Sequence, residues 1–268
     1  MLQSAPVLEK FFPYRRHRVN FHAHSTYSDG SCTPREIDAI AKASRRKNAL
    51  IGITDHNNVR AHEAFASPRI IPGVEVKVQE GGVDVLLYAE REKLIAFFHD
   101  VVRPTLDPFD PLYGATRLKI LELVGSAHEA GMKMVIPHYY HTEGLSVLAP
   151  SLQREVAKFP VAIELNALLS REANRKAKEF ARAVHRPLIA AADSHRPDQY
   201  LAAYTSIPLR RDAPPTAENL FCSLHAHPNF CRKHLREAGL STRLMTAWNV
   251  LCSAGPFSLL RQYFRSGS

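Results

Sequence analysis

The sequence is poor in cysteine and has no segment of membrane-spanning character. Four cysteines are spread over 268 residues, which is too few and too scattered to predict a disulfide framework in a chain of this size. Residues 244–260 carry no charge but contain several polar residues and a Gly-Pro pair, and the run falls short of the ~20 apolar residues of a spanning helix. We interpret it as a terminal helix docked on the core, with an interfacial membrane anchor as the alternative.

Other features are also missing from the chain. The first twenty residues lack the continuous apolar segment and the small-residue cleavage site of a secretory signal, so a cytoplasmic location is expected. The composition excludes collagen-like, coiled-coil and disordered classes. Acidic residues are outnumbered by basic ones, 26 against 35, which leaves a net charge of +9. This balance favours an anionic partner such as a phosphate ester, a nucleic acid or an acidic lipid.

Short apolar runs alternate with longer helical patterns, which is typical of repeated βαβ units and a parallel sheet. We predict strands at residues 18–21, 50–54, 70–76, 83–88, 134–137, 162–165 and 188–192. We predict helices at residues 34–47, 91–102, 117–130 and 171–184. Strand signals fade after Ser206, so we expect a barrel domain over residues 1–206 and a helical extension over residues 207–268 that packs on the barrel.

Histidine and acidic residues follow the predicted strands. His22 and His24 come two residues apart at the end of the first strand, so their side chains project from the same face. Later strands are followed by residues of the same kinds, which are Asp55, His56, Glu75, His138, Asp193 and His195. In parallel α/β folds the carboxyl ends of the strands form the rim where active sites are assembled. We therefore expect these side chains to meet at one site.

A single residue of this kind is more often a helix cap or a solvated side chain. Independent caps, however, would not select histidine at so many strand ends. Imidazole and carboxylate ligands together suit Zn, Mn, Fe or Co better than Ca or Mg, and the set exceeds what one tetrahedral ion requires. The sequence therefore predicts a centre of two or three divalent ions, with Mn, Zn or Fe as the candidates.

The motif set resembles the PHP family, the polymerase and histidinol phosphatase domain. The motifs are His22-x-His24-x₄-Asp29-Gly30, Thr54-Asp55-His56-Asn57, Gly73-Val74-Glu75, Pro137-His138 and Asp193-Ser194-His195. They cover residues 19–196, about two thirds of the chain. The resemblance implies an α/β fold, a distorted (β/α)₇ TIM-like barrel. It also implies a hydrolase that cleaves phosphate esters with a metal-activated hydroxide.

The resemblance also implies a ligand set, which divides between three ions. The first ion would take His22, His24, Glu75 and Asp193. The second would share Glu75 as a bridge and add His138, and the third would take Asp29, His56 and His195. Among these residues, Glu75, Asp193 and His195 are the expected catalytic residues.

This chain departs from the family pattern at the second ion. Many relatives have a histidine on the strand after the bridging glutamate, whereas here the best-placed residue is Asp84. Asp84 is either a metal ligand or a polar residue at a strand edge. Three roles are open for Asp55, which are a metal ligand, a hydrogen-bond partner of an imidazole and a helix N-cap.

Three further residues are candidates for binding substrate. Arg60 and Arg196 lie next to motif residues and could neutralise a second phosphate, although a solvated surface arginine is the alternative for each. Asn166 ends another predicted strand on the same rim and could touch substrate, with a cap or turn role as its alternative.

The expected substrate is a small nucleotide or a related phosphomonoester. The first alternative is a nuclease acting on 3′ or 5′ ends of RNA or DNA, because basic clusters such as Arg15-Arg16-His17-Arg18 recur along the chain. A second alternative is an amidohydrolase, which would need a bridging carbamylated lysine or an aspartate base borne by a strand. We identify no lysine that ends a strand among the ligands. A third is a catalytically silent module that binds nucleic acid or protein. Loss of ligands would mark such a module, and most of the ligand set is present.

Overall fold

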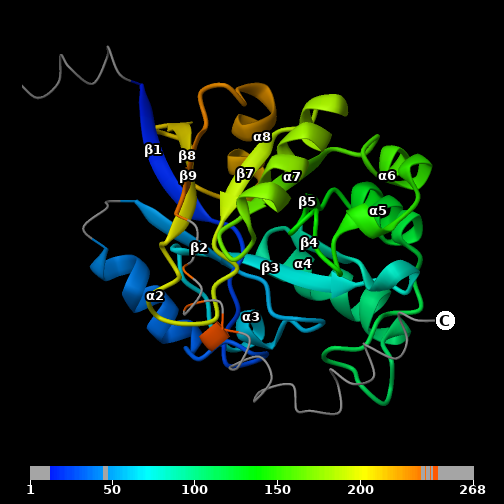
Figure 1. The fold of residues 1–268 in the computed structure, drawn as a ribbon. Coiled ribbons are helices and arrows are strands. Elements are labelled where there is room, and N and C mark those ends of the chain that lie inside the picture. Colours follow the sequence, from blue (N-terminus) through cyan, green and yellow to red (C-terminus); the bar gives the residue numbers. More distant parts are fainter. Residues whose placement is uncertain (1–12, 45–47, 237–238, 240–241, 243, 247–268) are drawn as a thin grey trace, which may run out of the picture.

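The computed structural model describes residues 13–44, 48–236, 239, 242 and 244–246 (Figure 1). The strands are β1 (Tyr14–Asn20), β2 (Ala49–Ile53), β3 (Ile70–Lys77), β4 (Asp84–Tyr88), β5 (Lys133–Ile136), β6 (Val161–Asn166), β7 (Leu188–Ala191), β8 (Ala203–Arg210) and β9 (Arg232–Leu235). The α-helices are α2 (Pro34–Ala43), α3 (Arg60–Ala64), α4 (Arg91–Phe97), α5 (Ile120–Glu129), α6 (Pro150–Val156), α7 (Arg171–Ala183) and α8 (Ala217–Ala226). Short 3₁₀ and π turns are η1 (Glu80–Gly82), η2 (Phe98–Val102), η3 (Arg103–Thr105) and η4 (Leu145–Val147).

The strands form one curled sheet in the order β7-β6-β5-β4-β3-β2-β1-β8-β9. Around this curled sheet, helices α5 and α7 pack against β5 and β6, whereas α2 packs against β2 (Figure 1). The predicted distorted barrel of mixed α/β class is confirmed. The predicted start of α2 is confirmed as well, because the Thr33 side chain accepts from Glu36 N and the Glu36 carboxylate accepts from Thr33 N, a capping box.

The prediction of a fully parallel sheet is wrong at β4. This strand runs antiparallel to both β3 and β5. Its connection to β3, residues 78–83, is too short for the crossover of a dozen or more residues that a parallel partner requires. The reversal places the first residue of β4 on the rim where β3 ends, so that Asp84 lies directly opposite Lys77.

The prediction that helices alone follow Ser206 is also wrong. Strand β8 continues to Arg210 and pairs antiparallel with β1, and β9 pairs antiparallel with β8. The predicted domain boundary between residues 206 and 207 therefore falls inside β8. Helix α8 packs Phe221 against Phe21 and Tyr88, with ring centroids 5.2 and 5.5 Å apart. Most of the uncharged run, residues 247–260, lies outside the described residues.

The barrel closes where the chain leaves β7 and meets the residues after β1. An isolated parallel bridge joins Ala23 to Ser194, and His24 N donates to Ser194 O at 2.8 Å. The Asn20 side chain adds a third link by accepting from Ala192 N at 2.9 Å. These bonds bring the segment that carries Asp193 and His195 against the segment that carries His22 and His24. No helix in the described part of the chain is long and apolar enough to cross a membrane.

Candidate metal centre

The predicted ligand residues meet at the carboxyl rim of the barrel in three groups. Within each group, one ligand atom per residue lies within 4.8 Å of all the others. The three-histidine group is His24, Asp29, His56 and His195. The central group is His22, His24 and Asp193. The carboxylate group is Glu75, Asp84 and His138.

Glu75 on β3 lies where the three groups join. Its Oε2 atom lies 3.3 Å from His22 Nε2 and 3.2 Å from His56 Nδ1, and its Oε1 atom lies 3.2 Å from His138 Nε2. Burial alone would raise the pKa of Glu75, but the His22 and His56 imidazoles outweigh burial and hold it well below its usual range. Glu75 is therefore ionised and contacts residues of every group.

In the three-histidine group, imidazole rings surround one buried carboxylate. Asp29 Oδ2 lies 3.2 Å from His195 Nε2 and 3.5 Å from His56 Nε2, and the rings of these two histidines stack on the His24 ring at 4.4 and 4.5 Å. Burial opposes protonation of both histidines, yet the Asp29 charge raises the pKa of His195 to about 8 and that of His56 to about 10. In the protein without ions, protons thus partly neutralise this group.

Asp55 organises the loop that carries Asp29. Its two oxygens accept from Ser25 N and from the Ser25 hydroxyl, each at 2.6 Å, and from the Ser28 hydroxyl at 2.7 Å. Gly30 is needed in the same loop because a Cβ atom there would lie 2.1 Å from His24 O. Asp55 belongs to none of the three groups, so its carboxylate holds the loop.

In the carboxylate group, Asp84 Oδ2 lies 3.8 Å from His138 Nε2. Both Asp84 oxygens are buried and accept no hydrogen bond from any described residue. Burial raises the pKa of Asp84 to about 7, against the opposing charge of Lys77. His138 has a left-handed backbone, with φ of 29°, a strained conformation that is common at functional sites. Buried carboxylate oxygens that accept no hydrogen bond and lie beside an imidazole are suited to a divalent cation.

The expectation that no lysine ends a strand among the ligands is wrong. Lys77 is the last residue of β3, two residues after Glu75, so both side chains leave the strand on the same face. Lys77 Nζ lies 2.6 Å from Glu143 Oε1, and its side chain is 9% exposed. It therefore forms an ion pair at the edge of the carboxylate group.

Glu164 is a site residue that the sequence analysis missed. It lies on β6 and is 1% exposed. Its Oε1 atom lies 3.0 Å from His22 Nδ1, and its Oε2 atom accepts from His138 N at 2.6 Å. A carboxylate on Nδ1 orients an imidazole and leaves Nε2 available to a metal. The available signal was one acidic residue inside the apolar run of residues 161–165.

The fold can be compared with solved structures, whereas protein-family models and curated proteins give no match. PsfC from Pseudomonas syringae PB-5123 is 16% identical, with a TM-score of 0.62 over 89% of this chain and 98% of that one. A two-domain protein from Bacteroides vulgatus ATCC 8482, described as containing a predicted PHP-like metal-dependent phosphoesterase, is 15% identical, with a TM-score of 0.55 over 88% of this chain and 70% of that one. The lesion-specific endonuclease PfuEndoQ from Pyrococcus furiosus is 16% identical, with a TM-score of 0.64 over 82% of this chain and 58% of that one. The chain has a PHP-like fold.

Within this PHP-like fold, the predicted substrate-binding residues have different environments. Asn166 is fully buried, and its side-chain amide donates to Asp193 Oδ2 at 3.1 Å. The Arg60 guanidinium lies over the Tyr27 ring at 5.4 Å, and Arg196 Nε lies 3.3 Å from Asp198 Oδ1. Asn166 thus positions a predicted ligand, whereas the two arginines have partners outside the three groups.

A tyrosine from the loop of residues 106–119 covers part of the centre. The Asn57 amide donates to the carbonyls of Leu112 and Gly114 at 3.1 and 2.8 Å, which holds Tyr113 between them. The Tyr113 ring lies 5.5 Å from the His56 ring, and its buried hydroxyl has no hydrogen-bond partner among the described residues. The sequence analysis missed Tyr113 because its position depends on the contacts of its loop with Asn57.

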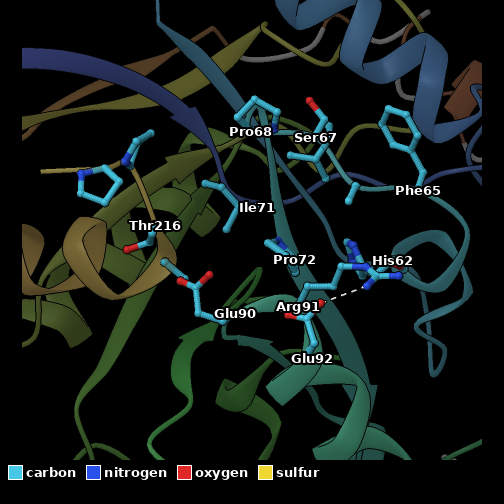
Figure 2. A pocket seen from close by; sticks show the side chains of 15 residues that line it. His62, Phe65, Ser67, Pro68, Ile71, Pro72, Glu90, Arg91, Glu92 and Thr216 are labelled. Atoms are coloured by element: carbon cyan, nitrogen blue, oxygen red, sulfur yellow. Dashed lines mark hydrogen bonds and ion pairs between the residues drawn. The ribbon is translucent and has the colours of Figure 1, made fainter.

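A separate surface pocket lies at the opposite end of β3. Figure 2 shows side chains from the start of β3, the start of α4 and the segment before α8 around it. His62 lines this pocket, but its Nε2 atom lies 3.0 and 2.9 Å from Ile53 O and Gly73 O, a structural role. None of the predicted ligands lines the pocket, so it is distinct from the metal centre.

Proposed function

We propose that this chain is a metal-dependent phosphoesterase that hydrolyses a phosphate ester, with a small nucleotide or a related phosphomonoester as substrate. The observation that carries the proposal is the joining of three ligand groups by the buried Glu75 at one rim of the barrel. The PHP-like fold, shared with a protein described as containing a predicted metal-dependent phosphoesterase, supports it.

The donor atoms fit divalent ions. The two imidazole nitrogens His22 Nε2 and His24 Nε2 lie 3.2 Å apart, close enough to bind one cation together. The proposed ligands of the first ion are His22, His24, Glu75 and Asp193. Those of the second are Glu75, Asp84 and His138, and those of the third are Asp29, His56 and His195. Mixed nitrogen and carboxylate donors favour Mn, Zn or Fe.

The chain's own residues prepare the site for attack at phosphorus. Divalent ions, when bound, acidify water and neutralise phosphate oxygens. The Asp193 side chain is 17% exposed, and Asn166 donates to its Oδ2 atom, which leaves Oδ1, 3.2 Å from His24 Nε2, to face an ion. Burial would raise the pKa of Asp193, but the His22 imidazole holds it well below its usual range. Asp193 therefore stays ionised at neutral pH.

His195 has the geometry of a ligand and not of a proton donor. Its Nδ1 atom lies 2.9 Å from the Asp193 carbonyl, which fixes the tautomer with the proton on Nδ1. When an ion displaces the proton from Nε2, this atom and Asp29 Oδ2, which lie 3.2 Å apart, would both be available to that ion. A ligating imidazole cannot readily protonate a leaving group, so we assign that proton to solvent.

A nuclease is the second candidate. Endonuclease Q, solved with a 27-mer duplex that carries an abasic lesion, is 17% identical with a TM-score of 0.61, and this chain spans 57% of its length. The net charge of +9 favours a polyanion as well. Ends of RNA or DNA, or a lesion within a duplex, are therefore alternative substrates.

The decisive experiment combines elemental analysis with a phosphate-release screen on one preparation supplied with Mn or Zn. The panel holds mononucleotides, 3′,5′-bisphosphonucleotides, short RNA and a duplex with an abasic site, and Glu63→Gln serves as a surface control. Two or three ions with phosphate release would support the phosphoesterase, and cleavage of nucleic acid alone would favour the nuclease. Less than one ion and no hydrolysis would favour a silent binding module. The cytoplasmic location stays a prediction of the sequence.

A further inference from the structure

The buried Lys77 forms an ion pair with the partly exposed Glu143, and the proposed chemistry does not use this pair. Lys77 lies directly opposite Asp84 in the antiparallel pairing of β3 and β4. Side chains of such a cross-strand pair leave on the same face, with Cβ atoms about 5 Å apart. The ammonium group therefore sits next to the one carboxylate of the centre whose oxygens have no hydrogen bond from the described residues.

We propose that Lys77 is a fixed positive charge that makes the carboxylate group the weak ion site of this centre. The other two groups hold their ions tightly, while the ion at Glu75, Asp84 and His138 binds last and exchanges. The inference rests on the proposed metal centre and deepens it, because it says how many ions remain bound at low metal concentration.

The first argument is electrostatic. A cation bound by Asp84 would lie a few ångströms from the Lys77 ammonium, in a region where Lys77 and Asp84 are 8% and 1% exposed. Repulsion at this distance is weakly screened by solvent, and it doubles for a divalent ion. By contrast, Asp29 in the three-histidine group contacts the imidazoles of His24, His56 and His195, and imidazoles become neutral when they ligate.

The second argument is the position of Glu143. Its carbonyl oxygen accepts from Asp84 N at 2.9 Å, and its Oε1 atom lies 2.6 Å from Lys77 Nζ. Glu143 thus draws the ammonium away from the Asp84 oxygens, which stay available to an ion. The same arrangement keeps the charge close enough to oppose that ion, so the site is open but weak.

The test measures Mn²⁺ binding to the full-length protein by equilibrium dialysis with elemental analysis, over a range of free Mn²⁺. We expect two ions bound tightly and a third bound weakly. Lys77→Met should strengthen the weak step about tenfold or more, and Lys77→Arg should leave it weak. Glu143→Gln, which frees the ammonium to pair with Asp84, should weaken the step about tenfold. Asp84→Asn should remove the step and so identify its location.

Lys133→Met is the matched control. Lys133 is also a partly buried lysine in an ion pair, 2.7 Å from Glu218, but it begins β5 at the opposite end of the barrel. Its substitution should leave all binding steps unchanged. An unchanged weak step in both Lys77→Met and Glu143→Gln would overturn the inference, as would a weak step that survives Asp84→Asn. If Lys77→Met does not fold, the binding measurement on Glu143→Gln still tests the inference. Absence of any bound ion in the unmodified protein would instead overturn the proposed function.

Discussion

The three-histidine group and the carboxylate group lie on one rim but are built differently. The three-histidine group comes from loops after β1, β2 and β7, and its rings stack around Asp29. The carboxylate group comes from the β3–β4 hairpin and the end of β5, and its Asp84 oxygens accept no hydrogen bond from the described residues. The comparison shows that the reversed direction of β4 brings Asp84 to this rim. It also predicts that the two groups differ in their effect on ion binding and turnover.

The largest effect is expected where the two groups join. Glu75→Gln keeps the side-chain volume but removes the charge that contacts His22, His56 and His138. We expect turnover to fall at least about a thousandfold, because charge stabilisation of this kind dominates such reactions, with the fold retained. Phosphate release and circular dichroism measure the two outcomes. Near-normal turnover in this variant would refute the shared centre.

Removing one ligand from each group tests the comparison directly. His195→Gln should lower turnover about a hundredfold with loss of a tightly bound ion, whereas Asp84→Asn should lower it about tenfold with loss of the weakly bound ion. Rates at saturating Mn²⁺ and metal content after dialysis distinguish the two losses. Equal effects of both variants would mean that the groups do not differ in function.

The pH dependence of stability should separate the ion-free from the ion-loaded protein. In the ion-free protein the pKa values of His195 and His138 are raised to about 8 and about 9, by Asp29 and Glu75 against the opposing effect of burial. Since these values exceed the unfolded value, the stabilisation is complete below pH ~6.5 and is lost as the pH rises through 8 and 9.

The ion-free protein should therefore lose about 2 kcal/mol of unfolding free energy through His195 and about 3 kcal/mol through His138 between pH 6.5 and 9.5, seen as a lower Tm. The ion-loaded protein should gain stability over the first part of this range, because ligands must lose protons to bind. Calorimetry with and without a chelator measures how Tm depends on pH in the ion-free and in the ion-loaded protein. Parallel slopes would show that these histidines do not bind ions.

Glu164 links the central group to the carboxylate group from behind, through His22 and His138. Glu164→Gln keeps a hydrogen-bond acceptor for His138 N but weakens the orientation of His22. Loss of such an outer partner typically lowers metal affinity 10–100-fold, and we expect about tenfold at the central group. Metal titration measures the affinity of the central group. The control is Glu80→Gln, because the Glu80 side chain accepts from Ile120 N away from the centre. Unchanged affinity would reduce Glu164 to a structural residue.

Much of the barrel and of the ligand set could be predicted from the sequence because the signals are local. Apolar runs mark the strands, and residues such as His56 and His138 directly follow them. Asp84 could not be assigned in the same way, since its place on the rim depends on the reversal of β4. Lys77 was missed because the predicted strand ended one residue earlier.

The residues that position others were harder to find. Glu164 lies inside a strand that otherwise has the pattern of a buried apolar segment, and only the closed barrel shows that it faces His22. Tyr113 depends on hydrogen bonds between its loop and Asn57, which are distant in sequence. Such placements follow from tertiary contacts, which a local pattern does not encode.

The smallest effect is expected from Tyr113, whose ring lies 5.5 Å from the His56 ring of the three-histidine group. The Tyr113 hydroxyl has no partner among the described residues, so Tyr113→Phe removes no hydrogen bond and should change the unfolding free energy by less than about 0.5 kcal/mol. A hydroxyl so placed can bond to bound substrate, and its loss should raise KM about threefold with kcat unchanged. Tyr139→Phe is the matched control, because its hydroxyl donates to Gln153 Oε1 at 2.7 Å. The Tyr139→Phe variant should lower Tm and leave KM unchanged. If Tyr113→Phe also lowers Tm and leaves KM unchanged, Tyr113 contributes to packing and not to substrate binding.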